Sequence, residues 1–276
     1  MSNLKPIGVF DSGYGGLTIL KELKNHLPDY DYLYLGDNAR TPYGSRSFEV
    51  VYEFTLQAVK ELFNRGCELI IIACNTASAK ALRTIQQEFL PTLNQPNKRV
   101  LGVIRPSVEV ISTVTKTNHV GILATPGTVK SDSYPIEIHK INQGIRVHQK
   151  SCPIWVPLIE NSLHTSDPGK AFIKMDVEEL LDLNAQIDTI ILGCTHYPIL
   201  KQHIETIVPN NVNVIAQGPI VAQKLADYLG RHPQIESNCS KGGELFYLTT
   251  ENAEDFNRQA SNFIGEDVQA KHIKLI

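Results

Sequence analysis

The sequence predicts an α/β fold of two similar lobes, each with a mainly parallel sheet flanked by helices, and related to each other by a pseudo-twofold axis. Three observations support this fold. Short apolar runs recur along the chain, helical stretches lie between them, and two strand-end motifs of the first half return in the second half. A regular strand-then-helix order is typical of parallel sheets with right-handed crossovers.

The predicted strands are aliphatic runs without polar alternation, as expected where helices cover both faces of a sheet. They lie at 7–10, 32–35, 69–73, 100–104, 120–124, 189–193 and, after a polar loop, 245–248. In such folds ligands bind beyond the carboxyl ends of the strands. The residues that directly follow each strand are therefore the first candidates for a functional site.

Helices are predicted between these strands. Apolar residues recur at roughly helical spacing over 48–64, residues 77–89 are rich in Ala, Leu and Gln, and a further helix begins near Gly16. Turn-prone residues at 94–98 and 209–211 mark two boundaries. The predicted lobes are residues 1–97 plus 213–276 for the first and residues 98–212 for the second.

An internal repeat supports the division into two lobes. The matching segments are 8–13 with 121–126 and 71–76 with 191–196, in the same order along the chain. The repeat places Cys74 and Cys194 at equivalent strand ends. If the lobes face each other about a twofold axis, these two cysteines confront each other across a cleft.

The composition excludes several classes of protein. In 276 residues, 26 Lys and Arg stand against 29 Asp and Glu, which gives a net charge of −3 and argues against a surface for nucleic acid or an anionic membrane. No apolar run approaches the roughly 18 residues of a membrane helix. The start, Met-Ser-Asn-Leu-Lys-Pro, lacks the apolar stretch of a signal peptide, which predicts a cytoplasmic protein. The 5 cysteines include no C-x-x-C pair, which argues against a disulfide framework or a metal site.

Cys74 and Cys194 each end a predicted strand and precede a predicted helix N-terminus. Unpaired amides and the positive end of a helix dipole favour a thiolate there. A thiolate and a thiol on opposite faces of a carbon acid remove a proton from one face and return it to the other, which inverts the stereocentre. The alternative is that both are small core residues, as cysteines at buried strand ends usually are.

Neighbouring residues extend this hypothesis. His196 is a candidate hydrogen-bond partner or proton donor for Cys194, or else a capping or surface histidine. Asp11 is a candidate to orient a substrate ammonium or to relay a proton to Cys74, or else a cap for the helix near Gly16. The glycines of the segment that Asp11 opens expose amides that bind an anion. That segment is not G-x-G-x-x-G and lacks Gly-Lys-Ser/Thr, so a carboxylate is favoured over a nucleotide phosphate.

The strand-end motifs resemble those of bacterial glutamate racemases, which belong to the aspartate/glutamate racemase superfamily. The matching segments are 11–18 (DSGYGGLT), 36–44 (GDNARTPYG), 73–77 (ACNTA) and 192–198 (LGCTHYP). The resemblance implies a cofactor-independent isomerase with its active site in the cleft between the lobes. It also implies L- and D-glutamate as substrates, a role in supplying D-glutamate for peptidoglycan and so for the cell wall and cell shape, and a homodimer.

The resemblance further implies roles for individual residues. Cys74 would be the base acting on D-glutamate, assisted by Asp11. Cys194 would be the base acting on L-glutamate, assisted by Glu160 and His196. The substrate carboxylates and ammonium would be held by Ser12, Pro42, Tyr43, Gly44, Asn75, Thr76 and Thr195, with Thr125 and Thr128 as further candidates.

Two positions depart from the family's pattern. Arg105 stands where the family often has Glu, and Gln217 stands where an Asp-Ser-Gly-like stretch is common. Neither position lies in the motifs proposed for chemistry. We therefore expect these departures to affect lobe contacts, the dimer interface or regulation and to leave the activity in place.

Other functions fit part of these observations. An aspartate racemase, or another α-acid racemase of the superfamily, would differ in the size of its cleft. An amidase would use Cys194 and His196 as nucleophile and base, but it leaves Cys74 without a role. A two-lobed amino-acid-binding protein would bind glutamate without exchanging its α-proton. A pyridoxal-phosphate enzyme needs a Schiff-base lysine and a phosphate cup, and no lysine stands in such a setting.

Overall fold

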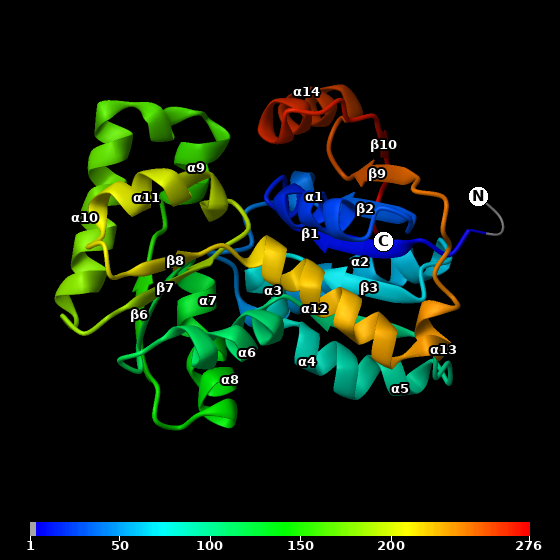
Figure 1. Cartoon of the computed structure of the whole chain (residues 1–276). Helices are drawn as coiled ribbons and strands as arrows, with labels where there is room; N and C mark the ends of the chain where they lie inside the picture. Colours follow the sequence, from blue (N-terminus) through cyan, green and yellow to red (C-terminus); the bar gives the residue numbers. More distant parts are fainter. Residues whose placement is uncertain (1–3) are drawn as a thin grey trace.

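The structure, a computed structural model, describes residues 4–276 as two sheets with helices packed around them (Figure 1). The first sheet has the strand order β10-β9-β2-β1-β3-β4 and the second has the order β6-β5-β7-β8. Every strand pair in both sheets is parallel, which confirms the predicted α/β class. Residues 1–3, which belong to the predicted first lobe and to the stretch considered as a signal peptide, lie outside the described residues.

The strands of the first sheet come from both ends of the chain. They are β1 (Ile7–Asp11), β2 (Tyr32–Gly36), β3 (Leu69–Ile72), β4 (Arg99–Gly102), β9 (Leu245–Thr249) and β10 (Ala270–His272). The strands of the second sheet are β5 (His119–Ala124), β6 (Arg146–Ser151), β7 (Thr189–Gly193) and β8 (Asn213–Ile215). The predicted aliphatic strands are all present.

The prediction missed β6, β8 and β10. All three strands were missed for the same physical reason. All of them lie at a sheet edge. Strand β6 has the polar sequence RVHQKS and no fully buried residue, and β8 and β10 have only 3 residues each. An edge strand with one solvated face carries no continuous apolar run, so the rule that found the central strands does not detect it.

The helices connect the strands as predicted. In chain order they are α1 (Gly16–His26), α2 (Phe48–Asn64), α3 (Asn75–Lys80), α4 (Leu82–Thr84), α5 (Leu90–Thr92), α6 (Ile104–Val114), α7 (Pro126–Lys130), α8 (Ser133–Ile141), α9 (Trp155–Glu160), α10 (Asp167–Asp182), α11 (Lys201–Ile207), α12 (Gln217–Arg231), α13 (Pro233–Glu236) and α14 (Ala253–Ile264). The short helical turns are η1 (Asn38–Arg40), η2 (Ile85–Phe89), η3 (Leu163–Thr165) and η4 (Tyr197–Leu200). No helix within residues 4–276 is both long and apolar enough to cross a membrane.

The predicted helix boundaries are best where a conventional capping residue such as serine is present. The predicted helix at 48–64 matches α2, and Ser47 caps it by accepting a hydrogen bond from the Val50 amide at 3.3 Å. The helix predicted at 77–89 begins two residues earlier, at Asn75, because Cys74 is its N-cap. It then runs through α4 into the π-helical turn η2.

The sheets divide the chain at other points than the predicted lobe boundaries. Strand β4 pairs with β3 in the first sheet, and β8 pairs with β7 in the second sheet. The chain thus leaves the first sheet after residue 102 and the second after residue 215, whereas the predicted boundaries follow residues 97 and 212. The turn-prone residues used for the prediction lie in the loops before β4 and β8. The chain crosses to the other sheet only after each of these strands. We call each sheet with its helices a unit.

The internal repeat corresponds to a repeat of topology. Four strands of the first sheet have the order β2-β1-β3-β4, and the whole second sheet has the equivalent order β6-β5-β7-β8. The first pair of matching segments covers the ends of β1 and β5, and the second pair covers the ends of β3 and β7. Cys74 and Cys194 therefore follow topologically equivalent central strands.

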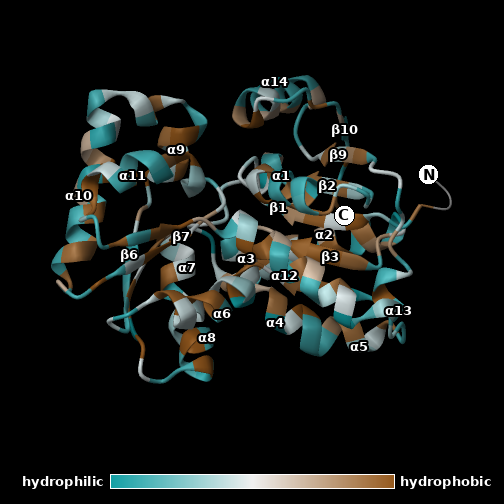
Figure 2. Cartoon of the chain, viewed as in Figure 1, coloured by the Kyte–Doolittle hydropathy of each residue, from teal (hydrophilic) through white to brown (hydrophobic). Residues whose placement is uncertain are grey.

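Each sheet is covered on both faces, which explains the strands' continuous apolar runs. Along β3, Ile71 packs into one hydrophobic cluster, while Ile70 and Ile72 pack into another on the opposite face. Ile191 and Ile190 of β7 divide in the same way. Hydropathy colouring shows the central strands predominantly hydrophobic, whereas many surface helices are of mixed character (Figure 2).

Candidate active site

The two cysteines lie where each central strand gives way to a helical turn. Cys74 follows β3, and its Sγ accepts a hydrogen bond from the Ala77 amide of α3 at 3.4 Å. Cys194 follows β7 and precedes the 3₁₀ turn η4, which continues into α11. Both residues are only 6% exposed. The predicted helix start is thus regular after Cys74 and begins as a tighter turn after Cys194.

The surroundings of Cys74 favour the protonated thiol. Its Sγ lies 3.4 Å from the Ser12 Oγ. Burial and the charge of Asp11 raise the pKa of Cys74 to about 12, although the contacts with Ser12 and the Ala77 amide act in the opposite direction. At neutral pH this sulfur therefore carries a proton that it can donate.

The surroundings of Cys194 place a positive charge beside its sulfur. The His196 Nδ1 lies 3.9 Å from the Cys194 Sγ, and the His196 Nε2 lies 3.0 Å from the Glu160 Oε1. Burial lowers the pKa of His196, but its contacts with Cys194 and Glu160 raise it, to about 10 overall. An imidazolium at this position stabilises negative charge on the Cys194 sulfur.

Asp11 connects the surroundings of the two cysteines. Its carboxylate is fully buried and accepts hydrogen bonds from the Thr195 Oγ1 at 3.3 Å and from the Gly13 amide at 2.9 Å. Burial raises the pKa of Asp11, and the charge of His196 together with these donors and the Gly16 amide lowers it. Asp11 also packs closely against Gly16, the first residue of α1, where a Cβ atom would lie 2.4 Å from the Asp11 Cβ.

The glycine-rich loop before α1 packs directly on the Cys194 motif. A Cβ atom on Gly15 would lie 2.3 Å from the Thr195 Oγ1 and 2.5 Å from the His196 Nδ1, so no side chain fits there. The Thr18 hydroxyl donates to the Thr195 carbonyl oxygen at 2.9 Å and holds the same contact one turn further along α1. The predicted catalytic residues are therefore brought together around this loop.

Several predicted substrate-binding residues meet at a second contact between the two units. The Thr76 Oγ1 lies 2.9 Å from the Thr125 Oγ1 and 3.4 Å from the Thr128 Oγ1. Nearby, the Gly127 amide donates to the Gly44 carbonyl oxygen at 2.7 Å. The Thr76 hydroxyl of α3, the Thr125 and Thr128 hydroxyls at the start of α7 and the loop at Gly44 thus lie together.

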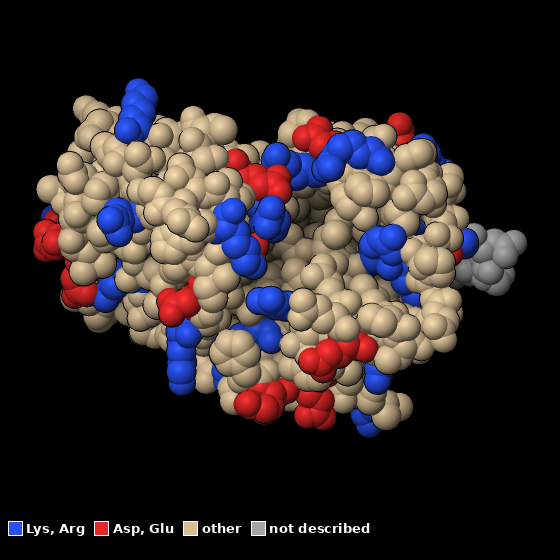
Figure 3. Space-filling view, turned by 90° about the horizontal axis from the view of Figure 1, so that it is seen from below, with Lys and Arg blue, Asp and Glu red and all other residues tan. Residues whose placement is uncertain are grey.

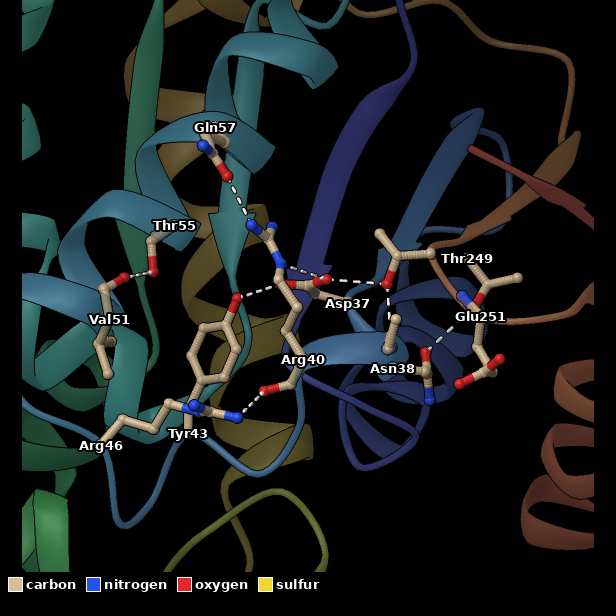
Figure 4. A network of polar contacts seen from close by, with 12 residues as sticks. Asp37, Asn38, Arg40, Tyr43, Arg46, Val51, Thr55, Gln57, Thr249 and Glu251 are labelled. Atoms are coloured by element: carbon tan, nitrogen blue, oxygen red, sulfur yellow. Dashed lines mark hydrogen bonds and ion pairs between the residues drawn. The ribbon is translucent and has the colours of Figure 1, made fainter. Parts of the chain in front are cut away.

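The Tyr43 hydroxyl is hydrogen-bonded to another side chain of the protein. It donates to Asp37 Oδ2, which also accepts from the Arg40 Nε at 2.7 Å, while Asp37 Oδ1 accepts from the Thr250 Oγ1 at 2.8 Å (Figure 4). Asp37 is fully buried. The network fixes the loop that carries residues 42–44, so we expect Pro42, Tyr43 and Gly44 to contribute to binding through the shape and backbone of this loop.

Sequence reasoning assigned no role to some residues that hold the site together. Asp37 lies within a quoted motif directly after β2, so the strand-end rule could have found it. Tyr134 of α8 is fully buried and donates its hydroxyl to the Asn75 Oδ1 at 2.8 Å. A tyrosine inside a helix carries no sequence signal for such a contact, which only the packing of α8 on α3 creates.

A separate cavity lies between α3, α6, α8 and α12. It has a volume of about 600 Å³, and neither Cys74 nor Cys194 lines it. Arg105, one of the two departures from the family pattern, lines this cavity and forms ion pairs with Glu109 and Glu137, each at 3.2 Å. The face seen in Figure 3 is hollowed near its middle, with basic and acidic side chains interspersed around it.

Neither metal coordination nor a disulfide involves the described cysteines. Within residues 4–276, no group of three or more His, Cys, Asp and Glu side chains is placed to hold a metal ion. All cysteines are free and buried. Cys67, Cys152 and Cys239 pack in hydrophobic clusters.

Known proteins are similar to this chain in both sequence and fold. The sequence pattern of the Asp/Glu/hydantoin racemase family matches residues 17–225. A glutamate racemase of Ruegeria sp. (strain TM1040) is 38% identical over 272 residues, which cover 95% of this chain and 97% of the relative.

Two crystal structures show the same similarity at the level of the fold. Glutamate racemase isoform RacE1 from Bacillus anthracis has a TM-score of 0.89 and 31% identity, and the match covers 99% of this chain and 98% of that chain. Glutamate racemase from Francisella tularensis, in complex with D-glutamate, has a TM-score of 0.86 and 34% identity, with 100% and 99% of the two chains covered.

Proposed function

We propose that this chain, which belongs to the Asp/Glu/hydantoin racemase family and is therefore an isomerase, interconverts L- and D-glutamate. The proposed reaction uses a two-base mechanism without a cofactor. The relatives that carry the name glutamate racemase match nearly the whole length of the chain. The observation that carries the mechanism is the pair of buried cysteines at equivalent strand ends, with one sulfur beside a hydroxyl and the other beside an imidazolium.

In the direction from L- to D-glutamate, Cys194 acts as the base. The His196 imidazolium, held by Glu160, stabilises the Cys194 thiolate. The thiolate takes the α-proton of L-glutamate and leaves the electron pair of the broken C–H bond on the α-carbon. The Cys74 thiol then donates its proton to the opposite face of that carbon, which forms D-glutamate and leaves Cys74 as the thiolate.

In the reverse direction the two sulfurs exchange roles. The Cys74 thiolate takes the α-proton of D-glutamate, and the Cys194 thiol returns a proton to the other face. The raised pKa of Cys74 makes its thiolate a strong base once it is formed, and the contacts with Ser12 and the Ala77 amide offset part of the free-energy cost of forming it. Asp11 lies beside this face and is proposed to assist proton transfer there.

The substrate is proposed to lie between the two sulfurs, held by both units. Thr76, Thr125 and Thr128 offer hydroxyls, and the backbone around Ser12 and Gly44 offers amides, for the two carboxylates. Thr195 and Asn75 flank the two cysteines in sequence. Hydrogen-bond donors from both units would make binding depend on the two units closing on the same ligand, which removes water from the thiolate.

The wider role follows from the same proposal. We infer that the chain supplies D-glutamate for peptidoglycan, in the cytoplasm and as a homodimer. Growth of a bacterial strain that requires D-glutamate should become independent of it when this chain is expressed, and a variant with both cysteines replaced by alanine should not restore growth. The mass of the protein in dilute solution, measured by light scattering, tests the dimer.

The mechanism is tested by following the exchange of the α-proton with D₂O by NMR, starting from each enantiomer. The wild-type chain should exchange both enantiomers and racemise them. Cys74→Ala should abolish racemisation while L-glutamate still exchanges through Cys194, and Cys194→Ala should show the opposite preference. An absence of exchange in folded wild-type protein contradicts the proposed function, and equal effects of the two variants contradict the assignment of the faces.

The same assay separates the alternatives. Faster exchange of aspartate than of glutamate would make the chain an aspartate racemase. Hydrolysis of an amide with a trapped acyl-enzyme on Cys194 would favour the amidase, and tight binding of glutamate without exchange would favour a binding protein.

A further inference from the structure

Gln217 occupies a buried junction behind the Cys74 side of the site. It is the first residue of α12 and is only 1% exposed. Its Oε1 accepts a hydrogen bond from the Asn75 Nδ2 at 2.7 Å. Its Nε2 lies 2.8 Å from the Ser107 Oγ, 2.9 Å from the Tyr134 hydroxyl and 3.3 Å from the Val103 carbonyl oxygen.

Three of these residues close a ring of hydrogen bonds. Asn75 donates to Gln217, Gln217 donates to the Tyr134 hydroxyl, and that hydroxyl donates to the Asn75 Oδ1 at 2.8 Å. We call these three residues the amide ring. Asn75 is 2% exposed and Tyr134 is fully buried, so water cannot replace a lost partner without cost.

The amide ring lies where the chain passes between the two sheets. Val103 is the first residue after β4, on the way to the second sheet, and Gln217 comes two residues after β8, on the way back. The Gln217 side chain therefore ties both crossings to each other and to α3 and α8. Figure 1 shows α12 running across the molecule beside this region.

The amide ring is linked to Cys74 through one peptide bond. Asn75 is the first residue of α3, and the preceding residue, Cys74, is the N-cap of that helix. The Asn75 Oδ1 and one Nδ2 hydrogen are committed to the ring, so its side chain holds the start of α3 against α8 and α12. A shift of this helix start moves the Cys74 sulfur relative to Cys194.

We propose that Gln217 is a positioning residue that, through Asn75, sets the place of the Cys74 sulfur without touching the substrate. This inference rests on the proposed racemase function. It also gives a role to the position that departs from the family's sequence pattern. A reacting sulfur displaced by about 1 Å loses up to about 100-fold in rate, because proton transfer depends steeply on geometry.

The discriminating readout is exchange at each face of the α-carbon. Two enantiomers have equal free energies in water, so kcat/KM must fall by the same factor in both directions for any variant. The exchange of the α-proton in D₂O has no such constraint, because each enantiomer can lose its proton to the sulfur on one face and regain a deuteron there after that sulfur has exchanged with solvent. Exchange of D-glutamate reports on Cys74, and exchange of L-glutamate reports on Cys194.

The test uses Gln217→Met, which keeps the side-chain volume and removes all of its hydrogen bonds. The matched control is Gln223→Met on the same helix, whose side chain is exposed and bonds His26 and Asp227. Gln217→Met should lower kcat/KM by about 10- to 100-fold and slow exchange of D-glutamate much more than exchange of L-glutamate. Gln223→Met should leave both rates unchanged.

Tyr134→Phe provides a second variant in case Gln217→Met folds poorly. It removes one hydroxyl from the amide ring, keeps the aromatic packing, and should show the same preference for the D-glutamate face. Equal loss at both faces, or no loss in either folded variant, overturns the positioning role. Wild-type protein that exchanges neither enantiomer overturns the racemase function itself, and the inference falls with it.

Discussion

The Thr195 hydroxyl donates a hydrogen bond to the Asp11 carboxylate over 3.3 Å, and this contact joins the two halves of the site. Asp11 precedes Ser12, whose Oγ lies 3.4 Å from the Cys74 sulfur. Thr195 follows Cys194 in the chain. A single carboxylate thus lies between the neighbourhoods of two sulfurs that are 120 residues apart in sequence (194 − 74).

Gly15→Ala should remove most of the activity. The added methyl group would lie 2.3 Å from the Thr195 Oγ1, so Thr195 and His196 must move away from it. We expect kcat/KM to fall by about 100-fold, as a displacement of about 1 Å commonly produces. Gly230→Ala is the control, since a Cβ there meets no atom within 4 Å. Wild-type activity in Gly15→Ala would show that this contact is not needed.

Glu160→Gln should shift the pH dependence of catalysis. The contact with Glu160 helps to raise the pKa of His196 to about 10, so His196 stays protonated through the neutral range. The neutral amide lowers that pKa, and the imidazolium is then lost at a lower pH. We expect the alkaline limb of kcat for L-glutamate, measured by polarimetry, to move toward neutral pH.

The control for this shift is Glu178→Gln, at an exposed carboxylate on α10 that pairs with Lys174. It should leave the pH profile in place. An unchanged alkaline limb in Glu160→Gln would mean that His196 does not control the reaction.

Tyr43→Phe should weaken substrate binding more than it slows turnover. It removes one donor from Asp37, which keeps its bonds from Arg40 and Thr250, so the loop at residues 42–44 loosens but stays attached. We expect a loss of about 1 kcal/mol in the free energy of unfolding and a rise in KM of about 3- to 10-fold. Steady-state kinetics and urea unfolding measure the two effects, and a fall in kcat at constant KM would contradict the binding role of the loop.

Asp188→Asn should destabilise the second unit without changing the site. Burial raises the pKa of Asp188, but hydrogen bonds from Thr115 and the amides of Thr117 and Lys116 lower it to about 2. Since the pKa is below its ordinary value of 3.8, the carboxylate stabilises the fold at neutral pH, and this contribution is lost as the pH falls from about 4 through 2.

The measured quantity is the free energy of unfolding in urea. At pH 7 the variant should lose about 2 kcal/mol, and the difference from the wild type should shrink on acidification. Asp227→Asn, at an exposed carboxylate on α12, should change little. A constant difference across the acid range would show that the loss comes from packing and not from the carboxylate charge.

The sequence determined the class of the fold and the central strands, and it singled out Cys74 and Cys194 as candidates for the site. Strands buried on both faces, such as β3 and β7, must be continuously apolar, so they are visible without any tertiary information. The polar edge strand β6 and the crossings after β4 and β8 were not visible, because an edge strand has no such constraint and a crossing depends on which strands pair.

Only the tertiary structure decided which polar groups share a site. Local sequence places His196 two residues from Cys194, but Glu160 reaches His196 from another helix, 36 residues away. Likewise Gln217 and Asn75 are 142 residues apart and meet only because the start of α12 packs against the start of α3. Hydrogen bonds between distant segments depend on angles and distances of a few tenths of an ångström, which the order of residues along a chain does not encode.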